Sequence, residues 1–309
     1  MTLKPPALPS GSRVAIVAPA SSANPDRIAR GLAALRGLGY DPVPADHACG
    51  KHPPYFSATS DERLADLHGA FADPSIAAIM CIRGGYGSNY LLPRLDLDLI
   101  RAHPKPFFAY SDLTAVQTWL LDQLGLVAFH GPMVAADFSQ PNGVHLPSFH
   151  AAITGGLLTV GVDEGLRVLR PGRAQGVLYG GCLSILAASL GTPWTPQTED
   201  KLLFLEDRGE KPYKLDRLLR QMILGGKFQG VRGVIFGEML DCADDPAQLD
   251  EVILRVLADF DVPIAIGLRS GHVSHGCVTL PLGLEADLNL HSDPPQLQIL
   301  EPAVIPHAG

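Results

Sequence analysis

Residues 105–115 read KPFFAYSDLTA, a short apolar run that stops at a serine and continues in a helical pattern. A strand, a sharp turn and a helix project the turn residue from the carboxyl end of a parallel sheet, where open α/β sheets bind their ligands. This stretch therefore predicts that Ser111 is a nucleophile on a strand-to-helix turn, although the usual G-x-S-x-G pattern is absent. The alternative is that Ser111 or Asp112 only caps the helix, a frequent use of both residue types.

The segments around this stretch alternate between apolar strands and helices. In the first half, strands are predicted at 13–18, 77–82, 106–109 and 127–130, and helices at 24–38, 60–72 and 112–124. Such alternation predicts a doubly wound parallel sheet, assigned to a domain of residues 1–150.

The pattern weakens between residues 143 and 165, where small residues, Pro and Gly accumulate, and we place a domain boundary there. Residues 165–309 predict a smaller, mixed α/β domain. Its helices are expected at 180–190, 212–224 and 246–259, and its strands at 166–169, 176–179, 201–205, 231–236, 263–267, 277–280 and 297–300.

The composition restricts the class of protein. The 309 residues are 46% hydrophobic and 18% charged with a net charge of −8, which argues against a nucleic-acid or anionic-membrane partner. No apolar run approaches the roughly 20 residues that span a bilayer, and no secretory signal is visible. Five scattered cysteines without a C-x-x-C pair predict small buried side chains, a reducing cytoplasm, and neither a disulfide scaffold nor a zinc site. We therefore expect a cytoplasmic protein without a cofactor or metal.

A hydrolytic serine needs a base, an acid that orients the base, and donors for the oxyanion. Two histidines, His272 and His275, lie in a loop of sequence GLRSGHVSHG after a predicted strand. Their spacing of three in a glycine-bearing loop is a poor zinc pattern, so a base is the better interpretation. The acid is Glu206 or Asp207, at the end of the apolar segment KLLFL.

The segment Gly84-Gly85-Tyr86-Gly87 follows the strand at 77–82. Successive glycines let backbone N–H groups approach a ligand closely, so the segment suits an oxyanion hole. A tight turn without a ligand is the simpler alternative. A phosphate loop is disfavoured because neither common phosphate-binding glycine pattern occurs here.

These pieces occur in a familiar order, and the sequence resembles the LD-carboxypeptidase family of serine peptidases, which includes microcin C self-immunity peptidases. The resemblance extends over the whole chain. It rests on VAIVAPAS (14–21), IRGGYGSNYLLPRLD (82–96), FAYSDLTAV (108–116), FHGPM (129–133), GGCLSIL (180–186), LLFLEDRGEKPYKLDRLLRQM (202–222), GVIFGEM (233–239) and GHVSHGCVTLPLG (271–283).

The resemblance implies a flavodoxin-like N-terminal domain that supplies a nucleophile, Ser111, to a cleft. The C-terminal domain would supply the orienting acid Glu206 and the base His272, which matches the family's Gly-His pair better than His275 does. The backbone N–H groups of Gly85 and Asp112 would form the oxyanion hole, with Asp112 also capping the helix. Homodimers are usual in the family.

The implied activity is hydrolysis of the L,D bond to the terminal D-alanine of murein tetrapeptides. The alternative keeps the same residues but cleaves peptidyl-nucleotide or other acyl-amide substrates, and a non-catalytic binding protein is a third hypothesis. A carboxypeptidase must hold a free carboxylate, for which Arg83 is a candidate, with Tyr86 beside it. The chain departs from the family at Ala109, where glycine is usual, and in a histidine loop about one residue longer.

Overall fold

A six-stranded sheet organises the first half of the computed structural model, which describes residues 2–306. Its strand order is β12-β5-β4-β3-β1-β2, and all neighbours are parallel except β12, which is antiparallel to β5. The order β2-β1-β3-β4-β5 is that of flavodoxin-like folds, as expected. The strands are β1 Arg13–Val17, β2 Asp41–Pro44, β3 Ile76–Cys81, β4 Phe107–Ala109, β5 Ala128–His130 and β12 Leu280–Leu282.

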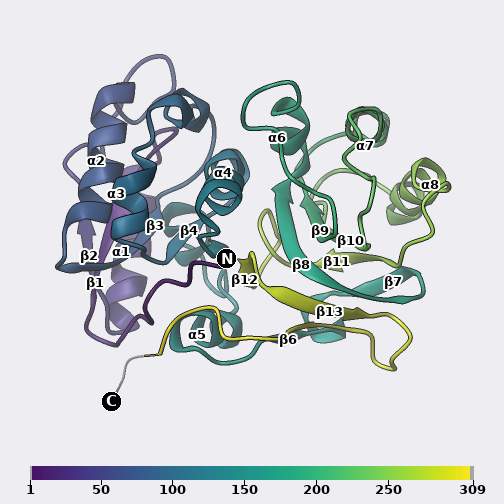
Figure 1. Cartoon of the computed structure of the whole chain (residues 1–309). Coiled ribbons are helices and arrows are strands. Elements are labelled where there is room, and N and C mark those ends of the chain that lie inside the picture. Colours follow the sequence, from purple (N-terminus) through teal and green to yellow (C-terminus); the bar gives the residue numbers. More distant parts are fainter. Residues whose placement is uncertain (1, 307–309) are drawn as a thin grey trace.

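Helices cover both faces of this sheet, as a doubly wound fold requires (Figure 1). Along β1, Val14 and Ile16 pack on the side of α1, whereas Ala15 and Val17 pack on the side of α2, α3 and α4. Both faces of the strand are buried, which explains its unbroken apolar sequence. The helices are α1 Pro25–Gly37, α2 Ser60–Ala72, α3 Leu97–Ala102, α4 Thr114–Leu124 and α5 Leu146–Thr154.

The second half forms an eight-stranded mixed sheet of order β6-β14-β13-β8-β9-β10-β11-β7. Its centre, β8 to β11, is parallel, and the flanking strands are antiparallel. The strands are β6 Thr159–Val160, β7 Arg167–Arg170, β8 Arg173–Cys182, β9 Lys201–Glu206, β10 Gly233–Gly237, β11 Ile264–Leu268, β13 Glu285–Asn289 and β14 Gln296–Ile299. The helices are α6 Leu183–Ala188, α7 Pro212–Leu224 and α8 Pro246–Val256.

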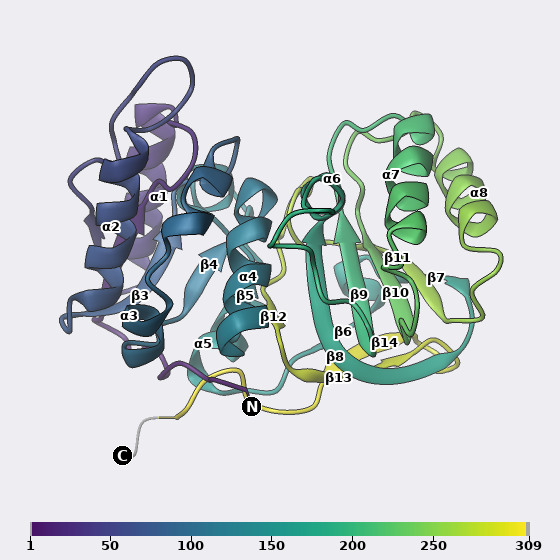
Figure 2. The same ribbon diagram turned by 45° about the horizontal axis from the view of Figure 1, so that its top comes forward.

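The two sheets stand side by side and share apolar core (Figure 2). One face of the second sheet, with Leu205 and Phe236, is covered by α6, α7 and α8. Residues of its other face, such as Phe204 and Ile235, belong to the same buried cluster as Phe129 of the first sheet. The carboxyl ends of β4 and β9 therefore face a common region between the sheets.

Several elements differ from the sequence-based expectation. The strand predicted at 277–280 is wrong, because β12 runs from Leu280 to Leu282. Both β12 and β2 contain proline, which weakens the strand pattern in the sequence. Both lie at edges of the first sheet, where proline is tolerated. Because β12 belongs to the first sheet, the chain returns to that sheet after residue 165. The division into domains of residues 1–150 and 165–309 stays a prediction.

The cysteine expectation holds for four side chains and is wrong for one. Cys81, Cys182, Cys242 and Cys277 are buried and free, whereas Cys49 is exposed. Cys49 lies in the turn that follows β2, and its side chain faces solvent. Within residues 2–306, no helix is long and apolar enough to cross a membrane.

Candidate active site

Ser111 lies on a strained turn directly after β4. Tyr110 is extended, Ser111 has a φ of +65°, and a short helical turn of residues 111–113 leads into α4. A non-glycine residue in this left-handed region is uncommon, and such strain, on the order of 1 kcal/mol, concentrates at functional sites. Ala109, where the family usually has glycine, is an ordinary strand residue, so its methyl group is accommodated.

The turn is tied to the glycine segment after β3. The carboxylate of Asp112 accepts a hydrogen bond from the Ser88 backbone N–H (2.8 Å), and the Ser88 hydroxyl donates to the Asp112 carbonyl (2.8 Å). Asp112 therefore does not cap the helix, and no side chain caps α4. The cap expectation is wrong because the carboxylate bonds across to another loop instead of along its own chain.

Gly84 and Gly85 lie against the serine. A Cβ atom on Gly84 would come within 2.7 Å of the Ser111 Cβ and 3.2 Å of the Asp112 backbone nitrogen. Gly85 has a φ of +106°, and its N–H donates to no acceptor in the described chain. The N–H of Asp112 is in the first turn of a helical segment, where amides lack an intrahelical partner. Both predicted oxyanion donors are thus free to serve a ligand.

Glu206 and His272 form a direct pair on the second sheet. Glu206, the last residue of β9, is fully buried, and its Oε2 accepts hydrogen bonds from the His272 backbone N–H (2.9 Å) and ring Nδ1 (2.8 Å). Asp207, the alternative acid, instead accepts from the backbone N–H groups of Ser184 and Arg208. Of the two candidate bases, His272 bonds to the Glu206 carboxylate, whereas the His275 ring pairs with the Ser274 hydroxyl.

The pair shifts both ionisation equilibria. Burial lowers the pKa of His272, but the charge and hydrogen bond of Glu206 outweigh it, so the pKa lies above the usual value of 6.5. Burial raises the pKa of Glu206, but the opposing effects of His272 and His130 hold it well below its usual range. The carboxylate is therefore ionised and the imidazole is a better base than in water.

Tyr110 and Asp137 extend this cluster. The Tyr110 ring packs edge-on against the His272 ring at 5.1 Å, and its hydroxyl donates to Asp137 Oδ1 at 3.3 Å. The other oxygen of Asp137 accepts from the Met133 backbone N–H at 2.8 Å. Burial raises the pKa of Asp137 to about 7. A carboxyl group that titrates near neutrality thus lies behind the histidine.

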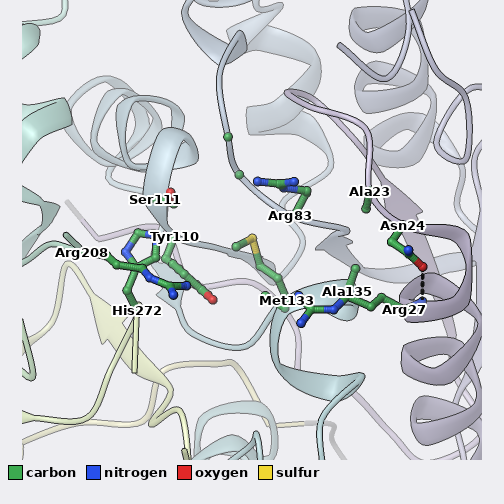
Figure 3. Close-up of a pocket in the computed structure, with 13 residues that line it drawn as sticks. Ala23, Asn24, Arg27, Arg83, Tyr110, Ser111, Met133, Ala135, Arg208 and His272 are labelled. Atoms are coloured by element: carbon green, nitrogen blue, oxygen red, sulfur yellow. Dashed lines mark hydrogen bonds between the residues drawn. The ribbon is translucent and has the colours of Figure 1, made fainter. Parts of the chain in front are cut away.

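A cavity of about 460 Å³ joins the two halves of the site. Its lining includes Ser111 and Gly85 from the first sheet, His272 and Arg208 from the second, and Arg27 and Arg83. Figure 3 shows Ser111, Tyr110, His272 and Arg208 on one side, Arg83 close to Ser111, and Arg27 reaching in from α1. This volume suits a small peptide-sized ligand.

Of the two suggested substrate-binding residues, only Arg83 lines this cavity. Tyr86 instead belongs to a partly exposed aromatic group, with its ring 5.6 Å from that of Tyr55 and 6.1 Å from that of Tyr90. Its role in substrate binding stays a prediction.

Sequence reasoning did not select Arg27, Tyr110, His130 or Asp137. FHGPM marked His130 as part of the resemblance, but a histidine at the end of a strand carried no sign of contact with Glu206. Arg27 lies in the first turn of α1, where a cation is unfavourable to the helix dipole, and this was an available signal. Among residues 2–306, no group of three or more His, Cys, Asp or Glu side chains could hold a metal.

Comparison with known proteins supports one family throughout. Residues 14–131 match the LD-carboxypeptidase N-terminal domain, and residues 175–288 match its C-terminal domain. A probable murein peptide carboxypeptidase of Bacillus subtilis is 36% identical, covering 94% of this chain and 92% of that protein. A murein tetrapeptide carboxypeptidase of Pseudomonas aeruginosa is 33% identical, covering 85% and 89%.

Solved structures agree. The microcin C7 self-immunity protein in its wild-type apo state superposes with a TM-score of 0.90 at 28% identity, covering 98% of this chain and 100% of that one. The matched domains carry the parallel strands of both sheets, and the relatives extend over nearly the whole chain. The chain belongs to the LD-carboxypeptidase family and is a serine-type carboxypeptidase.

Proposed function

We propose that this enzyme releases the terminal D-alanine of murein tetrapeptides through Ser111, His272 and Glu206. The observation that carries the proposal is one cavity that holds a strained serine and a histidine bonded to a buried, ionised carboxylate. Relatives named for murein peptides act as carboxypeptidases on this class of substrate.

In the first half of the reaction, His272 takes the proton of the Ser111 hydroxyl while the oxygen attacks the carbonyl of the L,D bond. The oxyanion is held by the N–H groups of Gly85 and Asp112. His272 then gives the proton to the leaving nitrogen, and D-alanine departs from an acyl-enzyme. In the second half, water loses a proton to His272 and attacks the acyl carbon, and His272 passes that proton to the Ser111 oxygen as the tripeptide leaves.

Two arginines supply the cationic wall that a free carboxylate requires. Neither Arg27 nor Arg83 has a carboxylate partner in the described chain, and the only side-chain hydrogen bond of Arg83 reaches the Ser22 carbonyl at 3.5 Å. Because both line the cavity, we assign Arg83, which lies nearer Ser111 in Figure 3, to the terminal carboxylate. Arg27 would meet a second acidic group farther along the peptide.

A second candidate is the cleavage of peptidyl-nucleotide substrates, favoured by the similarity to the microcin C7 self-immunity protein. That protein has been solved with aspartyl sulfamoyl adenosine. The aromatic rings that line the described cavity are Tyr110 and His272, and they already pack on each other.

The test is to incubate the purified enzyme with murein tetrapeptide and with an aminoacyl sulfamoyl adenosine, and to measure D-alanine and free adenosine product. We expect D-alanine release that Ser111→Ala lowers by at least about 10³-fold. Ser10→Ala, an exposed serine, is the matched control. Cleavage of only the nucleotide substrate would favour the second candidate, and undiminished hydrolysis by Ser111→Ala would exclude the serine mechanism.

We further propose that the enzyme acts in the cytoplasm as a homodimer, in line with its family resemblance. Light scattering coupled to gel filtration measures the assembly, and a mass near twice that of the chain is expected. Fractionation of the native cell measures the location.

A further inference from the structure

The two oxygens of the Glu206 carboxylate have unequal surroundings. Oε2 accepts both hydrogen bonds from His272, whereas Oε1 is buried and has no hydrogen-bond partner in the described chain. A buried anionic oxygen without a donor is costly, so the structure must compensate it in another way.

The ring of His130, the last residue of β5, lies on the side of that oxygen. Its Nε2 lies 3.8 Å from Glu206 Oε1, both side chains are fully buried, and this nitrogen also has no hydrogen-bond partner. Two unsatisfied polar atoms thus face each other across the interface between the sheets. His272 therefore contacts one oxygen of the carboxylate, Oε2, and His130 lies beside the other, Oε1.

The other ring nitrogen shows which protons His130 carries. Its Nδ1 lies 3.0 Å from the Ser270 hydroxyl oxygen, which lies 2.8 Å from the Val278 carbonyl oxygen. A carbonyl can only accept, so the single hydroxyl proton of Ser270 points to Val278, and Nδ1–H of His130 must donate to Ser270. A bare lone pair on Nε2 would repel the carboxylate at 3.8 Å, whereas an N–H at this position would attract it.

The packing leaves this arrangement little freedom. Gly271 has a φ of +86°, and a Cβ atom there would come within 2.6 Å of Glu206 Cδ and 2.7 Å of His130 Cε1. The Phe204 ring packs edge-on against His130 at 5.1 Å. The backbone next to His272 therefore closes over the Glu206–His130 contact, and a larger residue at 271 would separate the pair.

We propose that His130 is a positioning residue for the triad. Its Nε2–H balances Oε1 and prevents rotation of the Glu206 carboxylate, so that Oε2 stays on His272. Without this donor, the Glu206 carboxylate can rotate, and its hydrogen bond to His272 holds the imidazole ring less firmly. This inference rests on the proposed triad and concerns the rate of the chemical steps, since His130 does not line the cavity.

The test compares His130→Leu, which removes both nitrogens, with His130→Gln, whose amide can still donate toward Glu206. We expect His130→Leu to lower kcat for D-alanine release by about 10-fold or more with KM changed less than about 3-fold. His130→Gln should recover most of that loss. His150→Gln, at an exposed histidine of α5, is the control, and thermal unfolding is measured for every variant.

Nitrogen NMR of histidine-labelled wild-type enzyme adds a readout that does not depend on activity. Both ring nitrogens of His130 should have the shifts of protonated nitrogens, with His130→Gln used for assignment. The inference is overturned if His130 shows one unprotonated nitrogen, if kcat of folded His130→Leu is unchanged, or if Gln and Leu lower kcat equally. Wild-type enzyme that releases no D-alanine would instead refute the proposed function, and the NMR result would still decide on His130.

Discussion

Replacing Glu206 by Gln separates the charge of this residue from its hydrogen bonds. The amide oxygen of Gln can still accept from both N–H groups of His272, so the geometry is kept while the negative charge is lost. As the proposed general base, His272 must be neutral, and its raised pKa would place the acid limb of kcat/KM above pH 6.5 in the wild type. Activity should fall as the pH drops through that pKa.

The direction of the expected shift follows from the contact. Two unit charges about 4 Å apart interact by about 4 kcal/mol at an effective dielectric of 20. The His272 side chain is 19% exposed, so solvent screens part of this interaction, and the loss of the Glu206 charge should lower the pKa of His272. Asp207 and Asp137 also raise the pKa of His272 and remain in the variant, but burial opposes them. The acid limb should therefore move to lower pH, toward or below 6.5.

The assay is the pH dependence of kcat/KM for D-alanine release, with Glu199→Gln, at an exposed position, as the control. At the plateau, Glu206→Gln should be slower by about 10²- to 10⁴-fold, because the imidazolium formed in the reaction loses its counter-charge. An acid limb that stays in place or moves to higher pH would refute the assignment of Glu206 as the charged partner of His272.

Four further substitutions test other parts of the site. Gly84→Ala places a methyl group 2.7 Å from the Ser111 Cβ, and kcat should fall about 10-fold or more with a nearly unchanged melting temperature. Arg83→Met should raise KM for the tetrapeptide more than it lowers kcat, and Arg27→Met should do so only for peptides with a second carboxylate. Asp137→Asn should raise the melting temperature at pH 8 but not at pH 4. The Asp137 carboxyl has a pKa of about 7 in the folded protein and about 4 in the unfolded chain, so its ionisation destabilises the fold progressively as the pH rises above 4. An equal effect at both pH values would contradict this reasoning.

The elements that could be predicted are those with strong local signals. β1, β3 and β9 are continuous apolar runs because both faces are buried, and α1 begins at a proline after an asparagine whose side chain caps it. β2 and β12 were missed because proline interrupts them, and their position at sheet edges depends on strands far away in the chain. α5 was missed in a segment poor in helical signals.

The sequence by itself determined the alternation of the strongly apolar strands with helices, the serine after β4, and the acid and histidine placed at strand ends. Those features depend on local periodicity and on motifs that the family shares. Only the tertiary structure decided that Glu206 and not Asp207 meets His272, that Asp112 bonds to Ser88, and that His130 lies on the far side of the carboxylate. Each is a contact between residues at least 24 positions apart, and the burial that gives it its energy exists only once distant segments of the chain have packed together.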